Sequence, residues 1–195
     1  AVVRGAPDKF VVADMPFLSC SKGINVGMDA VHELMQTGAS AVKIEGAAHQ
    51  ADLIAHIVEA GVPVMGHIGL TPQSIHNLGG HKVQGKSEGD AQKLIDDAKR
   101  LEQAGCFSIV LECIPNKLGD CVSRAVSVPT IGIGAGPHTD GQVLVLHDLL
   151  GADPDFCPKF LRRYANVNQL VAGALNGFHE DVRNQSFPAL EETYG

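Results

Sequence analysis

The sequence predicts a parallel β/α (TIM) barrel, on two main observations. Short β-rich runs alternate with amphipathic helical stretches along the chain, as in a parallel sheet that is covered by helices. Most of these runs end in a polar residue, and the catalytic groups of a β/α barrel lie at the carboxyl ends of several strands. A doubly wound sheet is the alternative, but no G-x-G-x-x-G motif follows the first run.

The predicted strands are short apolar runs that end at a polar residue or at glycine. In chain order they are FVVAD (10–14), AVKIE (41–45), VPVMGH (62–67), FSIVLE (107–112), PTIGIG (129–134) and QVLVLHD (142–148). Two intervening helices are well marked by apolar residues at helical spacing. They are ADLIAHIVEAG (51–61), closed by Gly61, and GDAQKLIDDAKRLEQAG (89–105), closed by Gly105.

The domain organisation follows from length and composition. A chain of 195 residues that is 45% hydrophobic and 19% charged can bury one core. It has no linker or break in composition, so residues 1–195 are expected to form a single domain. A barrel has eight strands, and six are visible. Since the chain does not start with methionine, we expect that the first two strands belong to an absent N-terminal part, and that residues 1–195 alone have little activity.

Charge and cysteine content exclude several classes of partner. The net charge of −7 leaves no basic surface for nucleic acid. No run reaches transmembrane length, and the N-terminus lacks a signal-peptide pattern. The five cysteines are odd in number and contain no C-x-x-C pair, which suits a reducing compartment. We therefore expect neither nucleic acid nor membrane as a partner, and a cytoplasmic location, or an organelle if an earlier segment carried a targeting signal.

Two charged residues in one predicted strand are the first candidates for a site. Lys43 and Glu45 are two residues apart, so their side chains project from the same face of the strand. Burying charges is costly unless they are paired or bind something. A structural ion pair would satisfy both, and so would a metal with an anionic substrate. Their place at the end of a barrel strand favours the functional interpretation.

Polar residues at other strand ends extend the candidate site. Asp14 ends the first run, where it could also cap the following turn. Glu112 follows the apolar run FSIVL, where desolvation makes an unpaired carboxylate the stronger base that a weak carbon acid requires. A salt bridge to a neighbouring helix is its alternative. His67 lies in the same pocket, but it could equally be a satisfied hydrogen-bonding residue, so no role is assigned to it.

Three other features are less specific. Gly132, Gly134 and Gly136 could bind an anion through backbone amides or allow tight strand-to-loop packing. The stretch LTPQSIHNLGGHKVQGK (70–86) is predicted to be a long loop, and a long loop on the catalytic face is usually functional. His147 and Asp148 end the last predicted strand, where a structural role fits as well as any other.

Five motifs carry a resemblance to a known family. VKIEG, GHIGLTPQS, GGHKVQGK, VLECIP and IGIGAGPHTDGQVLVLHDLLG occur in this order, and the chain is similar over its whole length to ketopantoate hydroxymethyltransferases. The resemblance implies a barrel of the phosphoenolpyruvate/pyruvate type that requires Mg²⁺ and forms a high-order homo-oligomer. It also implies transfer of a hydroxymethyl carbon from 5,10-methylenetetrahydrofolate to 3-methyl-2-oxobutanoate, giving ketopantoate for pantothenate and coenzyme A synthesis.

The resemblance also implies roles for particular residues. Asp14 would be a magnesium ligand that also contacts the substrate, and Glu45 would be a second ligand. Lys43 would bind the keto acid, and Glu112 would accept its proton. No residue is assigned to the folate. The family has a further N-terminal G-D-S motif, with another metal ligand, that is not in this sequence, which puts the completeness of the metal site in doubt.

Two other functions compete with this interpretation. A magnesium-dependent carbon-carbon lyase of the same barrel group would share the keto-acid chemistry, but its cysteine-bearing signatures are not visible. An inactive fragment or a binding-only relative is the second alternative, because two predicted strands are missing. A reaction that depends on methylenetetrahydrofolate would distinguish a hydroxymethyltransferase from the lyase. The full-length sequence would show whether this chain is an inactive fragment or a binding-only relative.

Overall fold

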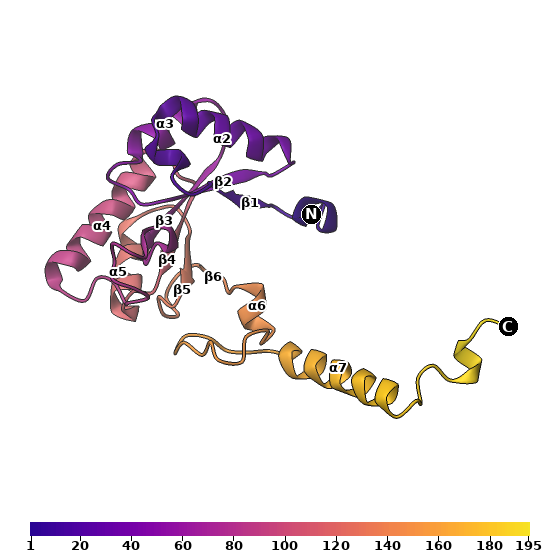
Figure 1. Ribbon diagram of the computed structural model, residues 1–195. Coiled ribbons are helices and arrows are strands. Elements are labelled where there is room, and N and C mark those ends of the chain that lie inside the picture. Colours follow the sequence, from indigo (N-terminus) through magenta and orange to yellow (C-terminus); the bar gives the residue numbers. More distant parts are fainter. The chain divides into compact units, whose positions relative to one another are not determined.

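The computed structural model describes all residues from 1 to 195, and its centre is a six-stranded parallel sheet (Figure 1). The strands are β1 (Val12–Asp14), β2 (Ala41–Glu45), β3 (Val64–Gly69), β4 (Ser108–Glu112), β5 (Thr130–Ile133) and β6 (Gly141–Gln142). Each strand pairs in parallel with the next in sequence, and β1 and β6 are the two edges. The curled sheet confirms the predicted fold class as an arc of a parallel β/α barrel.

A helix connects each pair of successive strands from β1 to β5, as the alternating pattern predicts, whereas a loop connects β5 to β6. The α-helices are α1 (Val2–Gly5), α2 (Ile24–Gln36), α3 (Ala51–Glu59), α4 (Glu88–Gln103), α5 (Asn116–Ala125), α6 (Leu146–Leu149) and α7 (Val167–Arg183), with short 3₁₀ turns η1 (Ser19–Ser21), η2 (Pro72–Ser74) and η3 (Leu190–Glu192). The two helices predicted from apolar spacing are confirmed as α3 and α4. Helix α4 begins where the Ser87 hydroxyl accepts a hydrogen bond from the Asp90 N–H at 3.1 Å.

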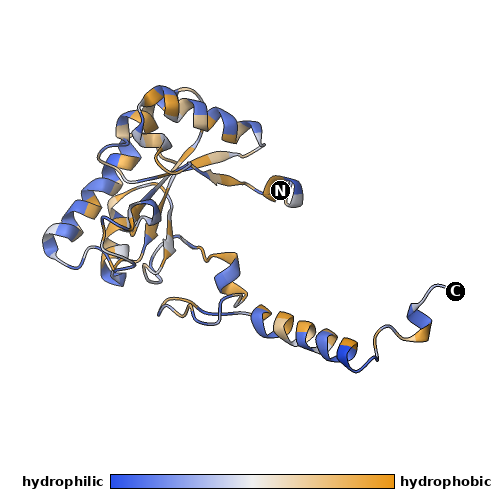
Figure 2. Cartoon of the chain, viewed as in Figure 1, coloured by the Kyte–Doolittle hydropathy of each residue, from blue (hydrophilic) through white to orange (hydrophobic).

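The two faces of the sheet differ in chemistry because side chains alternate along each strand. One face carries the apolar side chains that pack against α2 to α5, which gather on one side of the sheet in Figure 1. Figure 2 shows hydrophobic and hydrophilic residues interleaved along these helices, and the apolar residues of each contribute to the core. The largest fully buried side chains of this core are Val42, Ile44, Ile54, Ile57, Val64, Leu101, Ile109, Leu111 and Val122. Burying each contributes about 1.5–3 kcal/mol to folding. The opposite face carries the charged residues near the strand ends, together with apolar side chains such as Met65 and Val110.

The prediction of a strand at 142–148 is wrong for most of these residues. Strand β6 stops at Gln142, although the Val143 N–H still donates to the Gly132 carbonyl at 3.0 Å. Edge strand β6 has a partner on one side only, and β5 ends at Ile133, so the following residues have no strand to pair with. One turn of helix instead satisfies their backbone groups locally. His147 and Asp148 therefore lie in α6 and not at a strand end.

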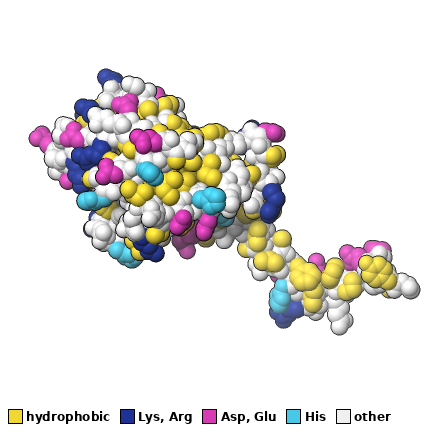
Figure 3. All heavy atoms as spheres, turned by 90° about the horizontal axis from the view of Figure 1, so that it is seen from above, with side chains coloured by type: hydrophobic (Ala, Val, Ile, Leu, Met, Phe, Trp, Pro, Cys, Tyr) yellow, Lys and Arg dark blue, Asp and Glu magenta, His cyan; other side chains and the backbone are white.

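The chain forms two compact units, Ala1–Val143 and Leu144–Gly195. The second contains α6, α7 and η3, and its α7 buries no residue. A row of apolar side chains on α7 is exposed, as the hydrophobic spheres along this segment show in Figure 3. The exposed residues are Leu170, Val171, Leu175, Phe178 and Val182. None of the helices has the length and apolar character that crossing a membrane requires. The single domain expected over residues 1–195 stays a prediction.

Gly69 allows β3 to approach β4 closely at the edge where both strands end. Its φ of +96° is unfavourable for other residues, and a Cβ there would overlap the Glu112 carbonyl oxygen. Gly61 has a similar φ of +90°, but a Cβ at that position would meet nothing within 4 Å. An alanine at Gly61 would therefore suffer backbone strain alone, whereas an alanine at Gly69 would suffer both strain and steric overlap.

We expect Gly69→Ala to lower the free energy of unfolding by about 3 kcal/mol or more, because strain and overlap add. Gly61→Ala should cost only about 1 kcal/mol, the strain alone. Urea unfolding followed by circular dichroism measures both. Equal losses in the two variants would show that the strands do not approach as closely as described.

Candidate active site

The register of the sheet brings the predicted site residues together. Asp14, Glu45 and Glu112 are the last residues of β1, β2 and β4. Asp14 pairs in register with Lys43, and Glu45 pairs with His67 of β3. Since parallel strands end at the same edge, these side chains form one polar cluster on the face opposite to the helices. We call Asp14, Lys43, Glu45, His67 and Glu112 the strand-end cluster.

Lys43 joins two strands of the cluster. Its Nζ lies 2.8 Å from Oδ1 of Asp14 and 3.2 Å from Nδ1 of His67. The side chain of Lys43 is only 19% exposed, whereas that of Asp14 is 65% exposed. The structural alternative considered above, an ion pair of Lys43 with Glu45, is not present. Lys43 is thus a partly buried cation with one exposed carboxylate as its counter-ion.

Glu45 is held by the loop that follows β3. The Gln73 N–H, in turn η2, donates to Oε2 of Glu45 at 2.9 Å. The amide Nε2 of the same residue donates to the Met15 carbonyl at 2.9 Å. Gln73 therefore ties the ends of β1 and β2 to one turn. Sequence reasoning placed the loop 70–86 at the site but did not single out Gln73, because both bonds depend on tertiary geometry.

His67 lies at the centre of the cluster and is only 2% exposed. Its Nδ1 faces Lys43, and Oε1 of Glu45 is 3.8 Å away, too far for a hydrogen bond. Its Nε2 lies 3.1 Å from Oε2 of Glu112. That contact does not meet the angular requirement of a hydrogen bond, so Nε2 is a buried polar atom without a hydrogen-bond partner.

The backbone around Glu112 is fixed from several sides. The Glu112 carbonyl accepts a hydrogen bond from the Leu70 N–H at 2.8 Å. Cys113, the next residue, has a φ of +49°, and its N–H donates to the Ile133 carbonyl at 2.8 Å. The Glu112 carboxylate is 17% exposed and has no Lys or Arg partner. The alternative of a salt bridge to a neighbouring helix is therefore not present.

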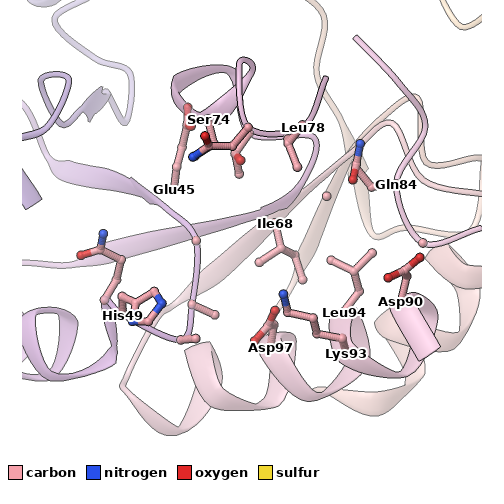
Figure 4. Close-up of a pocket in the computed structure, with 18 of the residues that line it drawn as sticks. Glu45, His49, Ile68, Ser74, Leu78, Gln84, Asp90, Lys93, Leu94 and Asp97 are labelled. Atoms are coloured by element: carbon pink, nitrogen blue, oxygen red, sulfur yellow. The ribbon is translucent and has the colours of Figure 1, made fainter. Parts of the chain in front are cut away.

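A cavity of about 660 Å³ borders the cluster at Glu45. It lies between the loop after β2, the loop after β3 and the first turns of α4 (Figure 4). His49, Ser74 and Lys93 are among its lining residues, and so is Gln50, whose buried Oε1 has no hydrogen-bond partner. Its volume is in the range of sites for small organic ligands.

The glycines within and after β5 serve close packing. A Cβ on Gly132 would lie 2.6 Å from Oγ1 of Thr139, and one on Gly136 would lie 2.5 Å from the Cβ of Asn116. Gly134 and Gly136 also have positive φ angles, 67° and 87°. Tight strand-to-loop packing, one of the two alternatives for this run, is therefore present. Anion binding by its amides stays a prediction.

Comparison with known proteins gives the family. Residues 1–190 match the family model described as ketopantoate hydroxymethyltransferase. The chain is 53% identical over 192 residues to the 3-methyl-2-oxobutanoate hydroxymethyltransferase of Coxiella burnetii (strain RSA 493 / Nine Mile phase I). The matched region covers 98% of this chain and 72% of the relative. This chain belongs to the ketopantoate hydroxymethyltransferase family. The protein of the same name from Bdellovibrio bacteriovorus is 53% identical over 194 residues, covering 100% of this chain and 74% of its own length.

A solved structure supports the fold independently of these sequence relatives. A Burkholderia cenocepacia J2315 protein assigned as a phosphonomutase superposes with a TM-score of 0.53 at 15% identity, over 72% of this chain and 65% of that one. At this identity the likeness concerns the fold alone. It agrees with the predicted parallel β/α barrel.

The side chains of the strand-end cluster include the kind of ligand that magnesium binds. The structure contains no group of three or more His, Cys, Asp or Glu side chains placed to hold a metal. Magnesium in proteins commonly takes one or two carboxylates and completes its shell with water and substrate oxygens. Asp14 and Glu45, at adjacent strand ends, each use one carboxylate oxygen in the contacts above and keep the other free. Two carboxylate oxygens at adjacent strand ends are therefore the type and number of protein ligands that magnesium commonly takes.

Cys113 reports on the charge of its neighbour Glu112. Two causes together raise the pKa of the Cys113 thiol to about 11: burial is the larger, and the negative charge of Glu112 is the smaller. At pH 9, two units below this pKa, only about 1% of Cys113 is thiolate, and the thiolate is the reactive form.

We expect Glu112→Gln to lower the pKa of Cys113, because it removes the repulsion and leaves only burial. Alkylation of Cys113 by iodoacetamide at pH 9 should then be severalfold faster than in the wild type. Peptide mass spectrometry measures the rate, with the exposed Cys121 and Cys157 as internal references. Unchanged alkylation at Cys113 would mean that Glu112 carries no charge beside it.

Proposed function

We propose that this site transfers a hydroxymethyl group from 5,10-methylenetetrahydrofolate to 3-methyl-2-oxobutanoate and so forms ketopantoate. Family membership supports the overall reaction. The observation that carries the proposal is the strand-end cluster, in which two carboxylates, a partly buried lysine and a third carboxylate converge on the ends of β1 to β4. No observation favours the carbon-carbon lyase considered above.

Asp14 and Glu45 would hold a magnesium ion together with the keto acid. When bound there, the ion would polarise the carboxylate and keto oxygens of the substrate as a Lewis acid. Gln73 contributes by fixing the orientation of Glu45, because it occupies Oε2 and leaves Oε1 free. The exposed Asp14 would also contact the substrate directly.

Lys43 would bind the anionic substrate. It is the only cation of the strand-end cluster, and its Nζ keeps a donor beyond those that face Asp14 and His67. A fixed positive charge in a partly buried site stabilises developing negative charge better than water does. Lys43 would therefore favour the enolate form of the keto acid over its ground state.

Glu112 would act as the general base. It would remove the proton from C3 of the keto acid, and the electron pair left on C3 would attack the methylene carbon of the folate, breaking one of the two bonds from that carbon to nitrogen. Water would then replace the second nitrogen on the same carbon and supply the hydroxyl group of ketopantoate. The proton from C3 and one proton from water would pass to the two nitrogens, which gives tetrahydrofolate. The cavity that borders the cluster at Glu45 leaves space for the folate donor. The residues that contact folate are not assigned.

The protein would also act as a homo-oligomer. The apolar row on α7 is exposed along most of the helix. Exposed apolar patches of this kind are characteristic of surfaces that contact other protein chains. We propose that copies of this chain assemble through such surfaces into a high-order oligomer.

Glu112→Gln tests the proposed base. The amide keeps the shape of the side chain but cannot accept the C3 proton, so exchange of the C3 hydrogen for deuterium should slow by about 100-fold or more. Binding of magnesium and of the keto acid should be retained, since neither depends on Glu112. Proton NMR of 3-methyl-2-oxobutanoate in deuterium oxide follows the exchange. Glu59→Gln, on the exposed end of α3, is the control. Exchange at the wild-type rate would rule out Glu112 as the base.

Glu45→Ala tests the proposed metal site. Removing one of few protein carboxylates on the ion should raise the magnesium concentration needed for half-maximal activity by about tenfold or more. Titration of ketopantoate formation with MgCl₂, at saturating keto acid and methylenetetrahydrofolate, measures the shift. Glu59→Ala should titrate like the wild type. If Glu45→Ala does so as well, Glu45 is not a ligand.

A further inference from the structure

His67 is the member of the strand-end cluster that the proposed reaction does not use. It is 2% exposed, yet both ring nitrogens face charged side chains. Buried polar atoms in folded proteins normally have hydrogen-bond partners, and one without a partner requires an explanation. The two nitrogens can be considered separately, because each faces a different kind of group.

The surroundings of Nδ1 decide where the ring proton lies. The Nζ of Lys43, 3.2 Å away, can only donate hydrogen bonds, and its charge is balanced by Asp14 at 2.8 Å. A protonated Nδ1 would therefore face a second donor at hydrogen-bond distance. Oε1 of Glu45 offers no alternative acceptor, since it lies 3.8 Å away. Nδ1 must accept from Lys43 and carry no proton.

The ring proton of neutral His67 then lies on Nε2, the nitrogen that faces Glu112. Oε2 of Glu112 is 3.1 Å from Nε2 but is not aligned with the N–H bond. Rotation about the last torsion of a glutamate side chain is soft, so a small turn of the carboxylate aligns the pair. Catalytic hydrogen bonds are often poorly aligned before substrate binds and tighten in the complex.

We infer that His67 is a positioning residue: Lys43 fixes it as the Nε2–H tautomer, and its Nε2–H holds Oε2 of Glu112. The other carboxylate oxygen, Oε1, is then directed to the substrate proton. The role of Glu112 as base rests on the proposed function, whereas the tautomer rests on the contacts of His67 alone. His67 thus links the residue that binds the anion to the residue that takes the proton.

The tautomer is tested without any activity measurement. Nitrogen NMR of the protein labelled with ¹⁵N-histidine distinguishes a protonated from an unprotonated ring nitrogen, and the signals of His67 among the nine histidines are those lost in His67→Gln. We expect a protonated Nε2 and a bare Nδ1. In Lys43→Met, Nδ1 faces only Glu45, so part of the proton should move to Nδ1. A protonated Nδ1 in the wild type, or no change in Lys43→Met, would overturn the inference.

A pair of variants tests the positioning of Glu112. The amide nitrogen of His67→Gln can replace Nε2–H, whereas His67→Asn is too short to reach Glu112 but can still accept from Lys43. Loss of an outer hydrogen-bond partner typically lowers activity by about 10- to 100-fold, and we expect this loss in the rate of C3 deuterium exchange for His67→Asn. The KM for the keto acid should change little, and His67→Gln should recover most of the rate.

The outcomes separate the inference from the proposed function. Equal loss of exchange in both variants, with unfolding midpoints that show both are folded, would mean that His67 only packs and would overturn the positioning role. A wild-type protein that exchanges no C3 hydrogen would contradict the proposed function instead. The tautomer measurement still decides the inference about Lys43 and His67 in that case.

Discussion

The parallel register of β1 to β4 is the constraint on which the site depends. It aligns Asp14 with Lys43 and Glu45 with His67, and it ends all four strands at one edge of the sheet. The same alternation places Val42 and the other core side chains on the helix-covered face. A slip of one residue would move the charges into that core and the apolar side chains out of it. Folding and assembly of the site are therefore the same event.

Partly buried charges are tolerated here because nearly every one has a matched partner. Lys43 has Asp14 and His67, and Glu45 accepts the Gln73 N–H. Such pairs seldom add much net stability, but removing one member leaves an uncompensated charge that costs several kcal/mol. Glu112 differs, since the only polar contact of its carboxylate is with a misaligned His67. The least satisfied carboxylate is the one that the proposed chemistry requires to accept a proton.

Sequence reasoning was most accurate where the pattern is local. It placed five of the strand runs at β1 to β5 and the helices α3 and α4, because apolar spacing and glycine stops decide these elements. It failed for 142–148, where a run of high β-propensity has no neighbour to pair with. The same local pattern placed the candidate site residues Asp14, Glu45 and Glu112 at strand ends, where the structure has them. Gln73 and the contacts of His67 were missed, because they join segments that only the fold brings together.

The position of His67 gives the site a property that no single residue has. Lys43 would bind the anion and, in the inferred tautomer, would also fix the ring proton of His67 on the side that faces Glu112, the proposed base. In a site of low dielectric, hydrogen bonds in such a series polarise one another. Under the proposed function, a substrate anion that attracts Lys43 would therefore act, through His67, on the carboxylate proposed to take its proton. Binding and proton transfer would be coupled because one buried ring contacts both residues, and Gln73 and the register of the sheet hold these groups in place.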